Sequence, residues 1–86
     1  IELGEIETAV MALPGMKAAC SVFDKDKDKI VLFYDSNNLT DEEIIESLKK
    51  RLQRYMIPNV FKKMDDMPLT PSGKIDRVKL KDYIGS

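Results

Sequence analysis

The sequence contains no histidine and only one cysteine, Cys20. Without histidine, the chain cannot form a Ser-His-Asp or Cys-His nucleophilic site, or a metal site that uses histidine ligands. A lone cysteine cannot form an internal disulfide, which fits a reducing compartment, so we expect a cytoplasmic protein. Because Cys20 lies in an apolar segment with no histidine to activate it, we interpret it as a small buried hydrophobic residue.

Long apolar segments are also missing. The longest apolar run covers residues 30–34, which is the length of a strand, whereas crossing a bilayer takes about 18–20 residues. The chain opens on the acidic segment IELGE, where a secretory signal would be basic, and it has no initiating methionine. We therefore expect no membrane partner, and we expect the chain to be a piece of a larger protein.

The length of 86 residues permits one domain, which buries about 60–65% of the surface that the unfolded chain exposes. Hydrophobic residues make up 43% and charged residues 34%, the balance of a globular rather than a disordered chain. The net charge of −1 conceals an asymmetry: residues 1–46 carry 4 lysines and 11 acidic residues, and residues 47–86 carry 10 basic residues and 4 aspartates. Local charge should therefore matter more than net charge.

The first half of the chain predicts one helix and two strands. Apolar residues recur at helical spacing over residues 4–13, and Pro14 with Gly15 ends that helix. Two β-prone runs follow, over residues 17–23 and 29–34, joined by the polar turn 24–28. The simplest interpretation is an antiparallel pair of strands covered by helices on one face.

A second helix is predicted after Thr40, which forms a capping box with Glu43. The helix is expected to end before Pro58, because proline disfavours a helical conformation in the preceding residue. Its last turns would carry basic residues, as the helix dipole favours: Lys49, Lys50, Arg51 and Arg54. Two interpretations remain for this basic cluster, a solvated helix end or a dedicated anion site.

A third strand over residues 60–64, a loop with two prolines and a closing helix over residues 78–83 complete the chain. The order of elements predicts an α+β fold: a small layered domain with a three-stranded, mainly antiparallel sheet and flanking helices.

Two patterns that resemble ligand sites are rejected. Asp24, Asp26 and Asp28 alternate as in a calcium loop, but Lys29 stands where that loop needs glycine. The pair at 73–74 resembles the end of a P-loop, but Pro68 replaces its first glycine and Ile75 its magnesium ligand. We expect no metal site in this chain.

The loop before the closing helix contains the strongest candidate for chemistry. Thr70, Pro71, Ser72 and Gly73 fit a type I turn, which would present Lys74 from a short, stiff segment. A lysine so placed is a mobile point charge suited to a phosphate or carboxylate group. The alternative is that Lys74 belongs to a solvated basic tail together with Arg77, Lys79 and Lys81.

Three segments resemble motifs of the adenylate-forming enzymes, the superfamily of peptide-synthetase adenylation domains, acyl-CoA synthetases and luciferases. Residues 68–77 (PLTPSGKIDR) look like the last core motif, and residues 55–58 (YMIP) resemble the motif before it. Residues 1–7 (IELGEIE) resemble the end of the hinge motif that opens the small C-terminal domain. Together the three segments reach from one end of the chain to the other.

The resemblance implies that residues 1–86 form the mobile C-terminal lid of a two-domain ligase, whose large N-terminal domain binds ATP, Mg²⁺ and the carboxylic acid and is absent here. Such enzymes form an acyl-adenylate and release pyrophosphate; the lid then rotates and a thiol attacks the adenylate. By position, Lys74 matches the catalytic lysine of the first half-reaction. Three further residues match the loop near substrate and nucleotide, namely Ser72, Gly73 and Arg77. Three more are remnants of the hinge motif, namely Glu2, Gly4 and Glu5.

The segment Gly73-Lys74-Ile75 is followed by Asp76-Arg77, a pattern that resembles the corresponding segment in the lids of peptide synthetases and D-alanine–carrier protein ligases. The resemblance therefore implies an amino-acid substrate and, as acceptor, the phosphopantetheine thiol of a carrier protein. The alternative is the lid of an acyl- or aryl-CoA synthetase, with CoA as acceptor. We expect no nucleic-acid partner, because base-reading and stacking side chains are not evident. The isolated piece is expected to be inactive.

Overall fold

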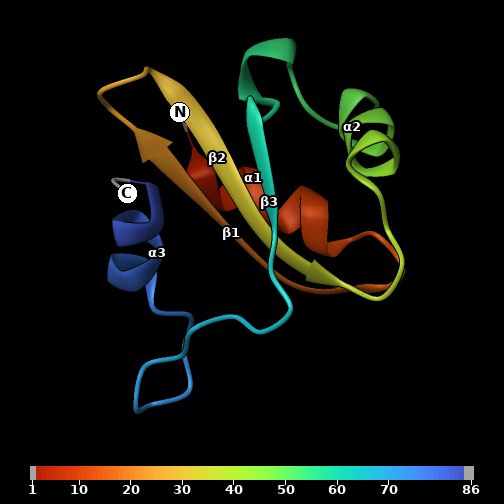
Figure 1. The fold of residues 1–86 in the computed structure, drawn as a ribbon. Helices are drawn as coiled ribbons and strands as arrows, with labels where there is room; N and C mark the ends of the chain where they lie inside the picture. Colours follow the sequence, from red (N-terminus) through yellow and green to blue (C-terminus); the bar gives the residue numbers. More distant parts are fainter. Residues whose placement is uncertain (1, 85–86) are drawn as a thin grey trace.

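The computed structural model describes residues 2–84, which form three α-helices, three strands and one 3₁₀ turn. Figure 1 shows how these elements are arranged. In chain order they are α1 (Leu3–Met11), β1 (Met16–Asp24), β2 (Lys29–Ser36), α2 (Asp41–Lys49), the 3₁₀ turn (Arg54–Met56), β3 (Val60–Lys63) and α3 (Arg77–Ile84).

The three strands form one sheet with β2 in the middle. β1 pairs antiparallel with β2, with Cys20 opposite Phe33, and β3 pairs parallel with β2, with Phe61 opposite Leu32. A parallel pair needs a crossover connection, and the segment that contains α2 supplies it. The predicted α+β class and the three-stranded, mainly antiparallel sheet are confirmed, with β3 as the parallel member.

β2 is buried on both faces of the sheet. Successive side chains of a strand point to opposite faces, so Leu32 and Tyr34 pack among α1 and α2. Val31 and Phe33 pack on the other face, against Leu80 of α3. In Figure 1, α1 lies behind the sheet and α3 at its side near β1. The prediction that helices cover only one face is therefore wrong, because the apolar run of β2 needs cover on both.

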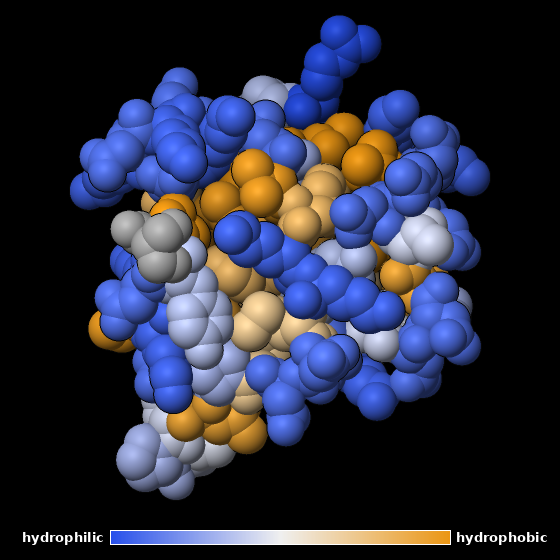
Figure 2. Space-filling view, viewed as in Figure 1, coloured by the Kyte–Doolittle hydropathy of each residue, from blue (hydrophilic) through white to orange (hydrophobic). Residues whose placement is uncertain are grey.

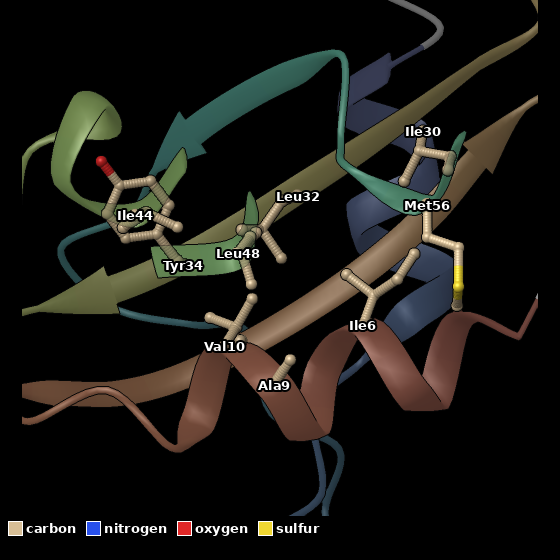
Figure 3. Close-up of a cluster of buried hydrophobic side chains, with 10 residues drawn as sticks. Ile6, Ala9, Val10, Ile30, Leu32, Tyr34, Ile44, Leu48 and Met56 are labelled. Atoms are coloured by element: carbon tan, nitrogen blue, oxygen red, sulfur yellow. The ribbon is translucent and has the colours of Figure 1, made fainter. Parts of the chain in front are cut away.

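The larger core lies between the sheet and helices α1 and α2. Helical residues four apart share one face, so α1 directs Ile6 and Val10 at the sheet and α2 directs Ile44 and Leu48. Figure 3 shows these side chains converging with Leu32 of β2, and all five are fully buried. This core holds α1 against the sheet.

Most element boundaries lie within two residues of the prediction. α1 ends at Met11 instead of residue 13, and Gly15 adopts a left-handed φ of +90° in the turn that follows. The capping box is confirmed, because Thr40 Oγ1 accepts from Glu43 N at 3.2 Å and Glu43 Oε1 accepts from Thr40 N at 3.1 Å.

The second helix is shorter than predicted. α2 ends at Lys49, so Arg51 and Arg54 lie outside it and helix polarity does not explain them. A straight continuation would carry Met56 about 10 Å beyond the end of α2. Instead the chain turns back after Leu52, and Met56 is buried in the larger core. Burial of Met56 thus overrides the helical pattern.

The surface combines charged side chains with a limited apolar area. Figure 2 shows hydrophobic residues gathered at the centre of one face between hydrophilic ones, and a weakly coloured projection at the bottom where Figure 1 shows the loop before α3. Leu69 within that loop and Val78 at the start of α3 are 59% and 73% exposed. No helix within residues 2–84 combines the length and the apolar character needed to span a membrane.

We predict that Leu32→Ala destabilises the chain by about 2–5 kcal/mol, because it leaves a cavity between the sheet and both helices of the larger core. Val78→Ala is the matched control, since Val78 is 73% exposed and its removal leaves no cavity. Urea unfolding followed by circular dichroism measures both values. An equal loss in the two variants would contradict the core described above.

Candidate functional site

The loop before α3 is a hydrogen-bonded hairpin. Asp76 N donates to Pro68 O at 2.8 Å, and Thr70 N donates to Lys74 O at 2.7 Å. Between these bonds, Leu69 and Ile75 form an antiparallel bridge. The hairpin projects from the body of the domain at the bottom of Figure 1. Its shape is therefore fixed by its own backbone, and this segment is called the 68–76 hairpin below.

The tip of the hairpin is the turn that the sequence predicts. Gly73 N donates to Thr70 O at 2.9 Å, which closes a four-residue turn. Thr70 Oγ1 also accepts from Lys74 N at 3.2 Å and lies 2.9 Å from Ser72 Oγ. Gly73 has φ +87°, a left-handed conformation in which a side chain costs about 1–2 kcal/mol. The need for glycine at this position is conformational, since a Cβ there would meet no atom within 4 Å.

Lys74 follows this turn and has an exposed side chain. Within residues 2–84 its ammonium has no ion-pair partner. The backbone of Lys74 is held at both its N–H and its C=O, whereas the charge at the end of its side chain is unused. A fixed backbone with an unused ammonium suits an anionic ligand supplied from outside the domain.

Lys74 lines an open groove of about 1180 Å³ between α1 and the hairpin. Three other predicted site residues line the same groove, namely Gly4, Ser72 and Arg77. Gly73 lies in the turn at the tip of the hairpin, and Glu5 is an exposed residue of the first turn of α1. Glu2 occupies the N-cap position of α1, where its carbonyl accepts from Glu5 N at 3.2 Å. The structure thus brings Gly4 of α1 and the loop of Lys74 to one groove.

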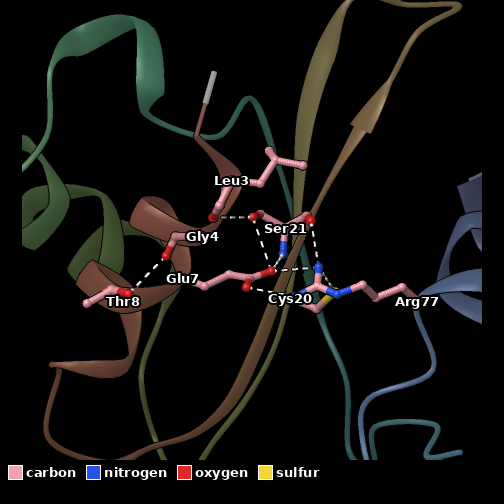
Figure 4. A network of polar contacts seen from close by, with 7 residues as sticks. All are labelled: Leu3, Gly4, Glu7, Thr8, Cys20, Ser21 and Arg77. Carbon is pink, nitrogen blue, oxygen red and sulfur yellow. Dashed lines mark hydrogen bonds and ion pairs between the residues drawn. The ribbon is translucent and has the colours of Figure 1, made fainter.

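Glu7 joins three elements on one wall of the groove. Its carboxylate receives both ends of the Arg77 guanidinium, with Nη2 to Oε1 at 2.8 Å and Nη1 to Oε2 at 2.9 Å. The backbone N–H of Ser21 donates to Glu7 Oε2 at 2.7 Å. Figure 4 shows Glu7 entering from α1 and Arg77 from α3, with both side chains meeting at Ser21 of β1. The network ties the first and last helices to the edge of the sheet.

The family model of the AMP-binding enzyme C-terminal domain matches residues 5–74, more than half of the chain. The chain belongs to this family. Its match ends at Lys74, the residue that the hairpin presents.

Curated relatives of this AMP-binding C-terminal domain are much longer proteins. Zwittermicin A synthase ZmaJ of Bacillus cereus is 40% identical over 90 residues, covering 100% of this chain and 17% of that protein. Gramicidin S synthase 2 of Brevibacillus brevis is 43% identical over 93 residues, covering 99% of this chain and 2% of that protein. The chain therefore spans a small part of the length of each.

Solved structures of adenylate-forming enzymes contain the same fold. NpsA of Klebsiella oxytoca has a TM-score of 0.91 at 22% identity, covering 100% of this chain and 18% of that one. O-succinylbenzoate coenzyme A synthetase of Bacillus subtilis has a TM-score of 0.81 at 28% identity, covering 95% of this chain and 17% of that one. The resemblance first noted in the three sequence motifs is thus confirmed.

Two contributors to the site were not among the predicted site residues of this AMP-binding C-terminal domain. Thr70 was assigned only to the turn, although a threonine whose hydroxyl accepts from a backbone N–H nearby is a known local pattern. Glu7 gave no local signal, because its partner Arg77 is 70 residues away. Arg77 itself contacts Glu7, Cys20 Sγ and Ser21 O within the domain. Its predicted place near a nucleotide stays a prediction.

The electrostatics of the network follow from its burial and its donors. Partial burial acts to raise the pKa of the Glu7 carboxyl, but hydrogen bonds from Arg77 and Ser21 outweigh it, so this pKa lies below its ordinary value of 4.5. Burial raises the pKa of the neighbouring Cys20 thiol to about 11. Cys20 is therefore a neutral, buried thiol, as predicted from the sequence.

Because the pKa of Glu7 is lowered in the folded chain, the free energy of unfolding should depend on pH. The ionised carboxylate stabilises the fold above about pH 4.5, the unfolded value, and this stabilisation is lost as pH falls toward the folded pKa. Urea unfolding of the chain and of Glu7→Gln should therefore show a stability difference that is largest above about pH 4.5 and shrinks in more acidic solution. A difference independent of pH would contradict the assignment. Glu46→Gln is the control, because its pair with Lys49 is exposed.

Proposed function

We propose that the chain is the mobile C-terminal lid of an ATP-dependent, AMP-forming ligase that activates an amino acid, and that Lys74 is its catalytic residue. The observation that carries this proposal is the position of Lys74: a fixed backbone at the end of a self-supported hairpin, with an ammonium that has no ion-pair partner within residues 2–84. The identity of 40–43% to peptide synthases supports the choice of enzyme class.

In the proposed first half-reaction, the hairpin enters the active site of the large N-terminal domain, which holds ATP and Mg²⁺. The carboxylate of the amino acid attacks the α-phosphorus, the acyl-phosphate bond forms and pyrophosphate leaves. The Lys74 ammonium contacts the carboxylate and the α-phosphate as these two anions approach. A preorganised contact of this kind is typically worth about 3–4 kcal/mol, or about 10²–10³ in rate.

Ser72 and Gly73 support this role through the backbone. The turn at Gly73 requires a left-handed φ, and Ser72 Oγ lies within hydrogen-bond distance of Thr70 Oγ1. Together they hold the turn that directs Lys74 outward. In the proposed second half-reaction the lid rotates about the hinge that precedes Glu2, Gly4 and Glu5. The phosphopantetheine thiol of a carrier protein then attacks the acyl carbon, and AMP leaves.

A second candidate is the lid of an acyl- or aryl-CoA synthetase, for which CoA is the thiol acceptor. The similarity to O-succinylbenzoate coenzyme A synthetase, at 28% identity, is the observation that favours it. Pyrophosphate exchange by the full-length enzyme distinguishes the two candidates. Exchange that depends on amino acids supports the first, and exchange that depends only on fatty or aryl acids supports the second.

We predict that Lys74→Ala in the full-length enzyme lowers acyl-adenylate formation about 10²–10³-fold, because the electrostatic contact is lost. Transfer of a preformed adenylate to the thiol should continue, since the hairpin leaves the active site before that step. Exchange of radiolabelled pyrophosphate into ATP measures the first step, and thioester formation measures the second. Lys27→Ala is the control, because it removes an exposed lysine from the β1–β2 turn. Unchanged exchange in Lys74→Ala would refute the catalytic role.

A further inference from the structure

The closest ion pair among residues 2–84 joins two sequence motifs that the proposed mechanism uses separately. Glu7 ends the segment 1–7 that resembles the hinge motif and lies on α1, and Arg77 ends the lysine motif of residues 68–77. Their two short contacts, at 2.8 and 2.9 Å, give the paired geometry in which both guanidinium nitrogens meet both carboxylate oxygens. The other pair in this part of the chain, between Lys49 and Glu46, has one contact of 3.4 Å.

The pair is anchored to the backbone of an edge strand. β1 lies at the edge of the sheet, so the outward N–H and C=O of Ser21 have no strand partner. Glu7 Oε2 accepts from that N–H at 2.7 Å, and Arg77 Nη1 donates to that C=O at 3.4 Å. The side chain of Glu7 is only 16% exposed. These contacts hold the pair in one place on the sheet.

The position of Arg77 is transmitted to Lys74 through two residues of chain. Asp76 N donates to Pro68 O and closes the base of the 68–76 hairpin. Asp76 Oδ1 also accepts from Lys79 N at 3.1 Å, which caps α3. A shift of Arg77 at the start of α3 therefore moves both the hairpin base and the helix. Glu7, Arg77 and Lys74 line the same groove.

We propose that Glu7 and Arg77 are positioning residues for Lys74: their ion pair on Ser21 sets the place of the 68–76 hairpin relative to α1. Arg77 acts on adenylate formation through Glu7 and not by contact with the nucleotide. The inference rests on the proposed catalytic role of Lys74. A catalytic group displaced by about 1 Å loses up to about 10²-fold in rate, so a modest loosening of the hairpin is measurable.

The test uses the full-length enzyme with Glu7→Gln, Arg77→Gln and the double variant. In Glu7→Gln one carboxylate oxygen becomes an amide donor that faces the N–H donors of Arg77 and Ser21. We expect kcat for pyrophosphate exchange to fall about tenfold to a hundredfold in each single variant, with KM for ATP and amino acid unchanged. The kcat of the double variant should be no lower than that of either single variant, because either change alone breaks the pair. Arg77→Lys keeps the charge but not the paired geometry, so its kcat should fall less than that of Arg77→Gln.

Two further measurements separate positioning from general loss of structure. Transfer of a preformed adenylate to thiol should be unchanged in all of these variants. Hydrogen exchange followed by mass spectrometry should show faster exchange in peptides from residues 68–77, with the peptides of β2 unchanged. Glu46→Gln, which breaks the exposed pair, should alter none of these values.

Three outcomes would overturn the proposal. A rise in the KM for ATP in Arg77→Gln alone would place Arg77 on the nucleotide. An equal fall in the rates of adenylate formation and of thiol transfer would show that the Glu7–Arg77 pair has only a structural role. Normal pyrophosphate exchange in Glu7→Gln, together with an inactive Lys74→Ala, would refute the positioning role of Glu7 and leave the catalytic role of Lys74 intact. If Lys74→Ala keeps normal pyrophosphate exchange, the proposed function fails. Hydrogen exchange in peptides from residues 68–77 still reports whether the Glu7–Arg77 pair holds the hairpin.

Discussion

Burial of β2 on both faces is the constraint on which the rest of this domain depends. A central strand whose side chains alternate between two cores requires an apolar layer on each side. α1 and α2 cover one face, and α3 must cover the other. β3 forms one edge of the sheet and α3 packs against β1 at the other edge, so the chain between β3 and α3 has to cross the second face, where Met67 is buried. The 68–76 hairpin lies in this passage, and the fold itself places it at the periphery, where it can reach another domain.

Within the 68–76 hairpin, a hydrogen-bonded backbone carries one exposed charged side chain, that of Lys74. The 68–76 hairpin is held by its own backbone bonds, and its base is held by Asp76 and Arg77. The side chain of Lys74 is exposed at the end of this frame. In the proposed cycle this division is useful, because a body that rotates between two half-reactions must deliver one ammonium to the same place each time. Because the hairpin backbone is already fixed, less conformational entropy is lost when the Lys74 ammonium is placed in the active site.

The sequence predicted those features whose causes are local. The capping box at Thr40, the turn at Gly73 and the three strands follow from residues a few positions apart, and all are present. The early end of α2 did not follow, because it depends on the burial of Met56 in a core built by distant elements. The Glu7–Arg77 pair could not be predicted for the same reason. Helical spacing identifies the face of α1 that is buried, but it does not say which residue meets Glu7 across the sheet.

The charge asymmetry of the chain acquires a physical meaning at this pair. An acidic first half and a basic second half would attract one another in any compact state, but weakly and without direction. Glu7 and Arg77 turn that attraction into one defined contact, because Ser21 supplies a backbone donor to the carboxylate and a backbone acceptor to the guanidinium. A reversed pair, with arginine at 7 and glutamate at 77, would keep the attraction and lose both backbone bonds. Burial of α1 and α3 against the sheet thus brings the two ends of the chain together, and the edge of β1 decides where their charges meet.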